Sequence, residues 1–341
     1  QKEKQKKSLL ATLTRTLLGL GLLGLLLAIL LPVGAYLYVS KSLPKVDTLA
    51  DYRPPIITRV LSDDGSVIAE LFEERRIIAP VSKMPKQLVQ AFVAAEDANF
   101  FKHQGIDIVS IIRAAIKNIK AGGIVQGGSS ITQQVAKSLL LTPERKFKRK
   151  FKEAILAYRM EKRLSKEEIL YLYLNQIFLG HGAHGVQAAA ENYFDKDVEN
   201  LTLAECSILA GLPKAPSRYS PYRHYERAKD RQVYVLGRMV SEGFITQEEA
   251  DQAAAQELVI RPRINQHLTN AAYFTEQVRR YLEDTYGEEQ LYRGGLEVQT
   301  SMNLQMQLAA QAAVQANLRD HDKRRGYRGP LAVLTPEEEE L

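Results

Sequence analysis

A long apolar run near the start of the chain is the strongest feature of its hydrophobic pattern. Residues 16–39 contain no charged side chain, and leucine is their commonest residue. The run exceeds the ~20 residues that an α-helix needs to cross a bilayer. The pattern therefore predicts a transmembrane helix over residues 16–39, preceded by a basic tail over residues 1–15.

The charges around this run predict its orientation. Lysines and one arginine precede it, so the positive-inside rule places the N-terminus in the cytoplasm and the chain after Lys41 outside. The alternative is a cleaved signal peptide, but the run is longer than a usual h-region. Its only cleavage-like tripeptide, Val33-Gly34-Ala35, is weak. We therefore expect an uncleaved single-pass anchor.

After the predicted anchor the pattern alternates. Apolar and polar side chains take turns over residues 56–81, on both sides of Asp63-Asp64-Gly65, which is a hairpin turn signal. We expect a short β-hairpin here, within a juxtamembrane linker over residues 40–84.

From Pro85, a suitable first helical residue, the apolar positions follow a helical period. Asp107 is a candidate cap for a helix to about Lys120, and further helices are expected up to Leu141 and from Pro143 to Arg163. Boxes of the S/T-x-x-E type mark later helix starts. They pair Ser165 with Glu168, Thr202 with Glu205 and Thr246 with Glu249. Residues 85–260 are predicted to form one compact, mainly α domain.

The pattern changes again at Arg261. A helix near residues 271–286, a strand near 295–301 and a helix over 304–318, with Asn303 as its N-cap, are expected. We assign residues 261–341 to a different unit.

Charge and cysteine content narrow the class of protein. The 341 residues carry a net charge of +6, concentrated before the anchor and again over residues 145–152. The anchor argues against nucleic acid as the target of these clusters. The single cysteine, Cys206, excludes an internal disulfide framework and is predicted to be buried. His181 and His184 bracket a glycine-rich loop, but a zinc site there is disfavoured.

Two adjacent acids end the first helix of the predicted domain. Glu96 and Asp97 follow an apolar helical stretch and precede aromatic residues and His103. An acid packed against apolar side chains resists ionisation, which makes proton transfer near neutral pH feasible. The alternative is a solvated helix end without function.

Two further helix starts are polar or basic. Residues 128–137 offer hydroxyls and amides at a helix N-terminus, which suit sugar oxygens or an anion, although a cap followed by a solvated turn would look the same. In the next helix Arg145, Arg149 and Glu153 lie four residues apart on one face. Such a face can clamp a diphosphate, and the alternative is a surface ion-pair ladder.

The segment over residues 106–120 is basic and amphipathic. An isoleucine stripe lies on one side, and Arg113, Lys117 and Lys120 lie on the other. Packing of the stripe against the core is the default expectation. Contact with acyl chains and lipid phosphates is the rival interpretation.

Together these segments resemble the peptidoglycan glycosyltransferase domain (family 51) of class A penicillin-binding proteins. The matching residues are Glu96-Asp97-x-x-Phe100-x-x-His103-x-Gly105-x-Asp107, Gly128-Ser129-Ser130-Ile131-Thr132-Gln133-Gln134 with Lys137, Arg149-Lys150-x-x-Glu153, Lys166-x-x-Ile169-Leu170-x-x-Tyr173-Leu174-Asn175 with Gly180, and Gly185-Val186-x-Ala188-Ala189 with Tyr193-Phe194. The resemblance continues through residues 210–217, and residues 292–296 and 325–330 resemble the 1A type. Ser130 stands where the family usually has threonine and keeps the hydroxyl.

The resemblance implies a fold, a substrate and site residues. The fold would be a mainly α, lysozyme-like, two-lobed glycosyltransferase domain, and the substrate would be lipid II and the growing glycan strand, outside the bacterial inner membrane. Glu96 would be the general base, and Glu153 would support the donor side. Side chains implied to bind substrate are those of Lys137, Arg149, Gln133, Gln134, Ser129, Thr132, His103, Asn175 and Lys150.

The resemblance also bears on cofactors and partners. No cofactor is required, although Mg²⁺ or Mn²⁺ could bridge the diphosphate, with Asp97 as the nearest spare carboxylate. Membrane lipids, other cell-wall synthesis proteins and an activating lipoprotein are candidate partners. Transpeptidase activity is not expected, because the only S-x-x-K match is Ser42-Leu43-Pro44-Lys45, beside the membrane. Two alternatives stay open: a lysozyme-like hydrolase or lytic transglycosylase, and a non-catalytic scaffold.

Overall fold

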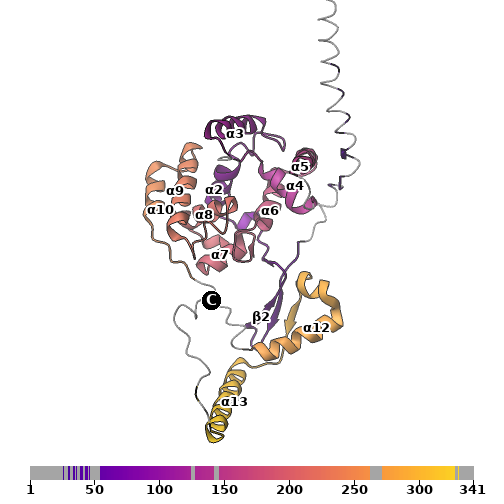
Figure 1. Ribbon diagram of the computed structural model, residues 1–341, viewed down its shortest axis with the longest axis vertical. Coiled ribbons are helices and arrows are strands. Elements are labelled where there is room, and N and C mark those ends of the chain that lie inside the picture. Colours follow the sequence, from indigo (N-terminus) through magenta and orange to yellow (C-terminus); the bar gives the residue numbers. More distant parts are fainter. Residues whose placement is uncertain are drawn as a thin grey trace, which may run out of the picture. The chain divides into compact units, whose positions relative to one another are not determined.

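The computed structural model describes residues 54–123, 127–141, 146–261 and 271–326, together with Gly329 and single positions between Leu26 and Val46 (Figure 1). The chain divides into two compact units. One comprises residues 1–53 and 78–261, and the other comprises residues 54–77 and 262–341.

The first unit is built almost wholly of helices. Within the described part of residues 78–261, its α-helices are α2 (Lys86–Glu96), α3 (Ile108–Ala121), α4 (Ile131–Leu140), α5 (Lys146–Glu161), α6 (Lys166–Gln176), α7 (Val186–Phe194), α8 (Leu203–Gly211), α9 (Tyr225–Ser241) and α10 (Gln247–Ala255). Short pieces complete the unit: the 3₁₀ turns η2 (Val81–Lys83), η3 (Val198–Asn200) and η4 (Leu212–Lys214), and the strand β4 (Ala183–His184).

Local sequence explains where these helices begin. Asp107 caps α3, and the boxes that start at Ser165, Thr202 and Thr246 all form, as predicted. A further box, in which the Ser130 side chain and that of Gln133 cap each other's backbone, starts α4. Pro85 is the N-cap of α2 and not its first helical residue.

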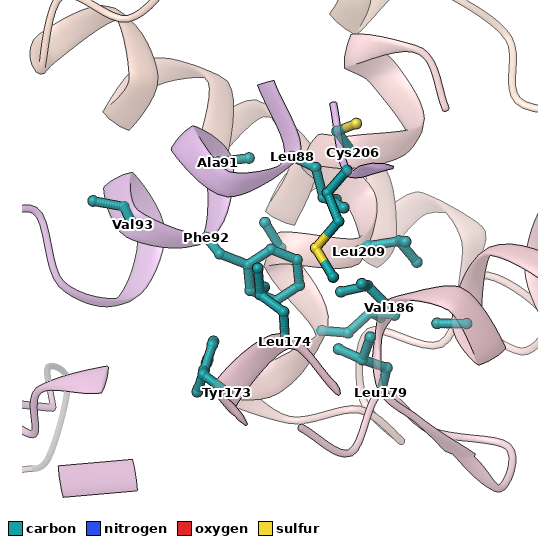
Figure 2. Packing of buried hydrophobic residues seen from close by; sticks show 14 of the residues in the cluster. Leu88, Ala91, Phe92, Val93, Tyr173, Leu174, Leu179, Val186, Cys206 and Leu209 are labelled. Atoms are coloured by element: carbon teal, nitrogen blue, oxygen red, sulfur yellow. The ribbon is translucent and has the colours of Figure 1, made fainter. Parts of the chain in front are cut away.

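Helix α2 lies at the centre of this unit and packs on α8 and α9 (Figure 1). Its side chains Leu88, Ala91 and Phe92 are fully buried, and Figure 2 shows them with Leu174 of α6 and Leu209 of α8 in one apolar cluster. Burial in this core places the last residue of α2, Glu96, at the edge of a low-dielectric region.

Cys206 belongs to the same cluster, as predicted. Burial raises the pKa of its thiol to about 12, so the reactive thiolate is not populated at neutral pH.

The second unit is a small mixed sheet with helices. Strands β1 (Thr58–Leu61) and β2 (Val67–Leu71) form the predicted hairpin, and β5 (Glu297–Gln299) pairs with β1 in parallel. The strand β3 (Arg75–Arg76) and the helices α12 (Ala272–Arg293) and α13 (Leu304–Arg324) complete the unit. Asn303 caps α13 as predicted. The hairpin therefore belongs with the C-terminal residues, because its first strand, β1, lies between β2 and β5 and pairs with both.

The expected core packing of α3 is wrong. Ala114 is the only buried residue of this helix. Its aliphatic side chains face outward instead, with exposures of 66% for Ile108, 55% for Ile112 and 80% for Ile119. The basic side chains Arg113, Lys117 and Lys120 are exposed as well.

The predicted membrane span lies mostly outside the described residues. Among the residues that the structure does describe, no helix is both long enough and apolar enough to cross a membrane. The span over residues 16–39 stays a prediction. Pro143 and Arg145 also lie outside the described residues.

Candidate active site

Glu96, the last residue of α2, is half-buried beside α4. Its carboxylate accepts a hydrogen bond from Gln134 Nε2 at 2.9 Å. Burial raises the pKa of Glu96, and the neighbouring charge of Asp97 adds to this effect. The Gln134 hydrogen bond and the positive charges of Arg231 and Lys214 act in the opposite direction, but the net direction is upward. Glu96 therefore keeps its proton up to a higher pH than an ordinary glutamate does.

Asp97 has different surroundings, although it is the next residue. Its carboxylate accepts hydrogen bonds from His103 Nε2 at 2.9 Å and from the Ile131 backbone N–H at 2.9 Å. His103 Nδ1 in turn accepts from the Gly105 N–H at 3.1 Å, which fixes the tautomer with the proton on Nε2. Asp97 and His103 therefore tie the end of α2 to the start of α4.

These bonds bear on the predicted roles of both residues. Asp97 and His103 are nearly buried, with side-chain exposures of 3% and 9%. Among the described residues, no group of three or more His, Cys, Asp and Glu side chains is arranged to hold a metal ion. Asp97 as a ligand for Mg²⁺ or Mn²⁺ stays a prediction, and its geometry here is that of a structural carboxylate.

Gly105 shows why this loop needs a glycine. Its φ is 87°, and a Cβ atom there would meet the Ala157 carbonyl oxygen of α5 at 2.6 Å. The Gly105 carbonyl accepts from the Ser130 hydroxyl. The loop between α2 and α3 can therefore lie directly against α5 and α4.

Helix α4 turns two of its predicted binding residues inward. Thr132 is fully buried, and its hydroxyl donates to Glu161 Oε1 at 2.7 Å. Gln133 is 5% exposed and serves the capping box. In this structure both side chains make packing and capping contacts, and their role in substrate binding stays a prediction. Gln134 faces Glu96, and Lys137 is exposed.

A partly buried ion pair continues this network behind α4. Lys166 Nζ donates to Glu161 Oε1 at 2.7 Å and to the His103 carbonyl at 2.8 Å. Its ammonium group also lies 4.4 Å from the centre of the Phe100 ring. Lys166 thereby holds the starts of α6 and α4, the end of α5 and the α2–α3 loop in one arrangement.

Helix α5 brings together three predicted residues. Glu153 is fully buried and accepts from Arg149 Nε at 3.2 Å and from Lys150 Nζ. Lys150 Nζ also donates to the Ser129 hydroxyl at 2.8 Å. The Arg149 and Lys150 side chains keep exposures of 25% and 50%. The expected shared face of Arg149 and Glu153 is confirmed, and a buried carboxylate holds two cations that still reach solvent.

Within the described residues, the Asn175 side chain forms hydrogen bonds with backbone atoms and not with charged side chains. It is 3% exposed, and its amide bonds the backbone N–H and C=O of Ala79 at 2.9 Å each and the Tyr171 carbonyl at 2.9 Å. These bonds fasten the end of α6 to the segment before η2, and a role of Asn175 in substrate binding stays a prediction.

Two basic residues near Glu96 were not predicted as site residues. Lys214 of η4 is exposed, and Arg231 of α9 is 8% exposed with its guanidinium 4.2 Å from the Tyr234 ring centre. Both charges lower the pKa of Glu96. Lys214 lies within residues 210–217, which resemble the family, so the sequence could have indicated it as a site residue. No motif in the sequence around Arg231 indicates such a role.

Comparison with known proteins identifies the family of this chain. Residues 64–240 match the sequence model of the transglycosylase family. The chain belongs to this family. It is 44% identical over 317 residues to penicillin-binding protein 1A of Rickettsia felis, covering 90% of this chain and 40% of that protein. The corresponding protein of Escherichia coli K12 is 44% identical over 301 residues, with 88% and 35% covered.

A solved structure is similar as well. The crystal structure of penicillin-binding protein 1A from Haemophilus influenzae matches with a TM-score of 0.51 and 31% identity, over 84% of this chain and 33% of that one. The chain thus spans about two fifths or less of the length of the relatives it matches.

Proposed function

We propose that this protein is a membrane-anchored peptidoglycan glycosyltransferase. It polymerises lipid II into β-1,4 glycan strands with inversion and releases undecaprenyl pyrophosphate. Family membership and the names of the relatives support the reaction class. The observation that best supports the proposal is that the unit contains both an acid with a raised pKa, Glu96, and two cations held in place by Glu153.

Glu96 is the general base. A sugar hydroxyl is a poor nucleophile, and removal of its proton in the transition state contributes roughly 10²–10⁴-fold to the rate. Glu96 takes that proton while the hydroxyl oxygen bonds to the anomeric carbon of the donor. The bond from that carbon to the pyrophosphate oxygen breaks in the same displacement, and its electron pair leaves with the pyrophosphate. A single displacement inverts the anomeric centre.

The leaving group needs neutralisation of charge and no protonation. Arg149 and Lys150 are held by Glu153 with their outer faces still exposed, so they can meet phosphate oxygens without reorganising. Lys137 is exposed on α4 and adds a further positive charge. Glu153 acts through these cations, because its own carboxylate is buried against them.

Helix α3 is suited to the membrane surface from which lipid II must come. It carries no acidic residue, and its exposed isoleucines lie beside Arg113, Lys117 and Lys120. Apolar side chains that enter the acyl region and cations that meet lipid phosphates are the two components of interfacial binding. We infer that α3 contacts the outer leaflet of the inner membrane.

Polymerisation of lipid II by the purified chain tests the proposal. We expect Glu96→Gln to lower turnover by about 10²–10⁴-fold and to leave the melting temperature unchanged or higher, because it removes a buried charge. The matched control is Glu199→Gln on the exposed turn η3, which should keep wild-type turnover. Glu96→Gln with wild-type turnover would contradict the base assignment. Soluble fragments released from intact glycan strands, with no product from lipid II, would favour a hydrolase.

A further inference from the structure

Tyr173 of α6 carries a buried hydroxyl that the reaction described above does not use. The residue is 2% exposed, and within the described part of the chain its Oη has no hydrogen-bond partner. A buried polar group without a partner is costly. Phenylalanine would fill the same space without that cost, so the hydroxyl needs an explanation.

The packing of the ring shows what lies near the hydroxyl. Tyr173 meets Phe92 edge to face, with ring centroids 6.0 Å apart (Figure 2). Phe92 and Glu96 are four residues apart on α2, so they share one face of that helix. Burial raises the pKa of Tyr173, and the charges of Glu96 and Asp97 raise it further. The phenol therefore lies within electrostatic reach of both carboxylates.

The two carboxylates differ in what they can still accept. Asp97 already receives hydrogen bonds on both oxygens from His103 and on Oδ2 from the Ile131 N–H. Glu96 receives one hydrogen bond in the described structure, from Gln134 to Oε2. A carboxylate has about four lone-pair sites, so Glu96 is the neighbour with spare capacity.

We propose that Tyr173 is a positioning residue for Glu96, and that its hydroxyl donates a hydrogen bond to the charged Glu96 carboxylate in the substrate complex. Hydrogen bonds of this kind commonly tighten only when substrate is bound. The bond favours the ionised form of Glu96, which is the form that accepts the proton of the acceptor hydroxyl. This inference rests on the proposed function, since it takes Glu96 as the base.

The test compares the pH dependence of lipid II polymerisation in the wild type and in Tyr173→Phe. Loss of the donor raises the pKa of Glu96 in the substrate complex, so the acidic limb of kcat should move to higher pH by about one unit. Turnover should fall about tenfold below the limb and recover at higher pH, while the acidic limb of kcat/KM, which reports the free enzyme, keeps its position. The melting temperature should not fall, because the variant removes a buried group without a partner.

Tyr193→Phe is the matched control. Tyr193 is also buried, but its hydroxyl donates to the Leu179 carbonyl at 2.8 Å. This variant should lower the melting temperature and leave the position of the acidic limb unchanged. If Tyr173→Phe behaves in the same way, its hydroxyl is structural and the inference is overturned.

Glu96→Gln, measured in parallel, separates this inference from the proposed function. If Glu96→Gln is inactive and Tyr173→Phe shows the wild-type limb, only the role of Tyr173 is contradicted. If Glu96→Gln stays active, the base assignment fails, and the role of Tyr173 fails with it.

Discussion

Glu96, which is half-buried, and Glu153, which is fully buried, are carboxylates of one unit with opposite surroundings. Glu96 accepts from a neutral amide, and its pKa is raised because burial outweighs the more distant cations. Glu153 lies against Arg149 and Lys150, both within ion-pair distance. The same residue type is therefore suited to gain and lose a proton in one place and to hold cations in the other.

This contrast assigns the steps of the reaction to different helices. In the proposed reaction, α2 ends in the group that exchanges a proton, and α5 presents charges that do not change. A change at Glu153 should therefore disturb both folding and chemistry, whereas a change at Glu96 should disturb chemistry alone.

Glu153→Gln should show the largest combined effect. Loss of the buried charge leaves Arg149 and Lys150 without their counter-ion, and we expect a loss of about 2 kcal/mol in the free energy of unfolding, a figure kept low because both cations are partly exposed. Turnover should fall about 100-fold. Denaturant unfolding and lipid II polymerisation check both values. An equal loss of unfolding free energy in Glu153→Gln and Glu96→Gln would contradict the different roles of these two carboxylates.

Arg149→Ala isolates the cation from its counter-ion. We expect turnover to fall about 10- to 100-fold, with a loss of at most about 1 kcal/mol in unfolding free energy, because this arginine is partly exposed. Arg149→Lys should recover part of the turnover but not all, since lysine lacks paired donors. If stability and turnover fell together in Arg149→Ala, the surface ion-pair interpretation would hold.

Ile119 of α3 should report contact with lipid and have the smallest effect on chemistry. The chain contains no tryptophan, so Ile119→Trp introduces a single fluorescent reporter. In bilayers that contain phosphatidylglycerol, its emission should shift to shorter wavelength. The control is Val233→Trp on α9, at a residue that is 54% exposed. Identical emission from both variants would contradict contact between α3 and the membrane surface.

The sequence predicted the elements around the site more reliably than the direction in which their polar side chains point. Caps and boxes depend on residues three positions apart, so α6, α8 and α10 begin where the pattern placed them. The contacts of Thr132 and Asn175 could not be predicted, because a hydroxyl or amide suits a sugar and a buried protein partner equally well. Their partners lie 29 and 96 residues away and become visible only in the fold.

The α3 error has a similar cause. Amphipathic periodicity shows that one face is apolar but not what covers that face. The aliphatic face of α2 meets α8 and α9, whereas the isoleucines of α3 remain exposed. The contrast between Glu96 and Glu153 could likewise be assigned only through the family resemblance, because burial and partners are properties of the folded chain.

The pH dependence of kcat/KM for lipid II polymerisation by the wild-type chain shows whether Glu96 is the general base. Glu96 must be ionised to act as the base, and its pKa lies above the ordinary value of 4.5. We expect a single acidic limb with an apparent pKa above 4.5, below which activity falls tenfold per pH unit. A rate that stays level down to pH 4.5 would contradict the role assigned to Glu96.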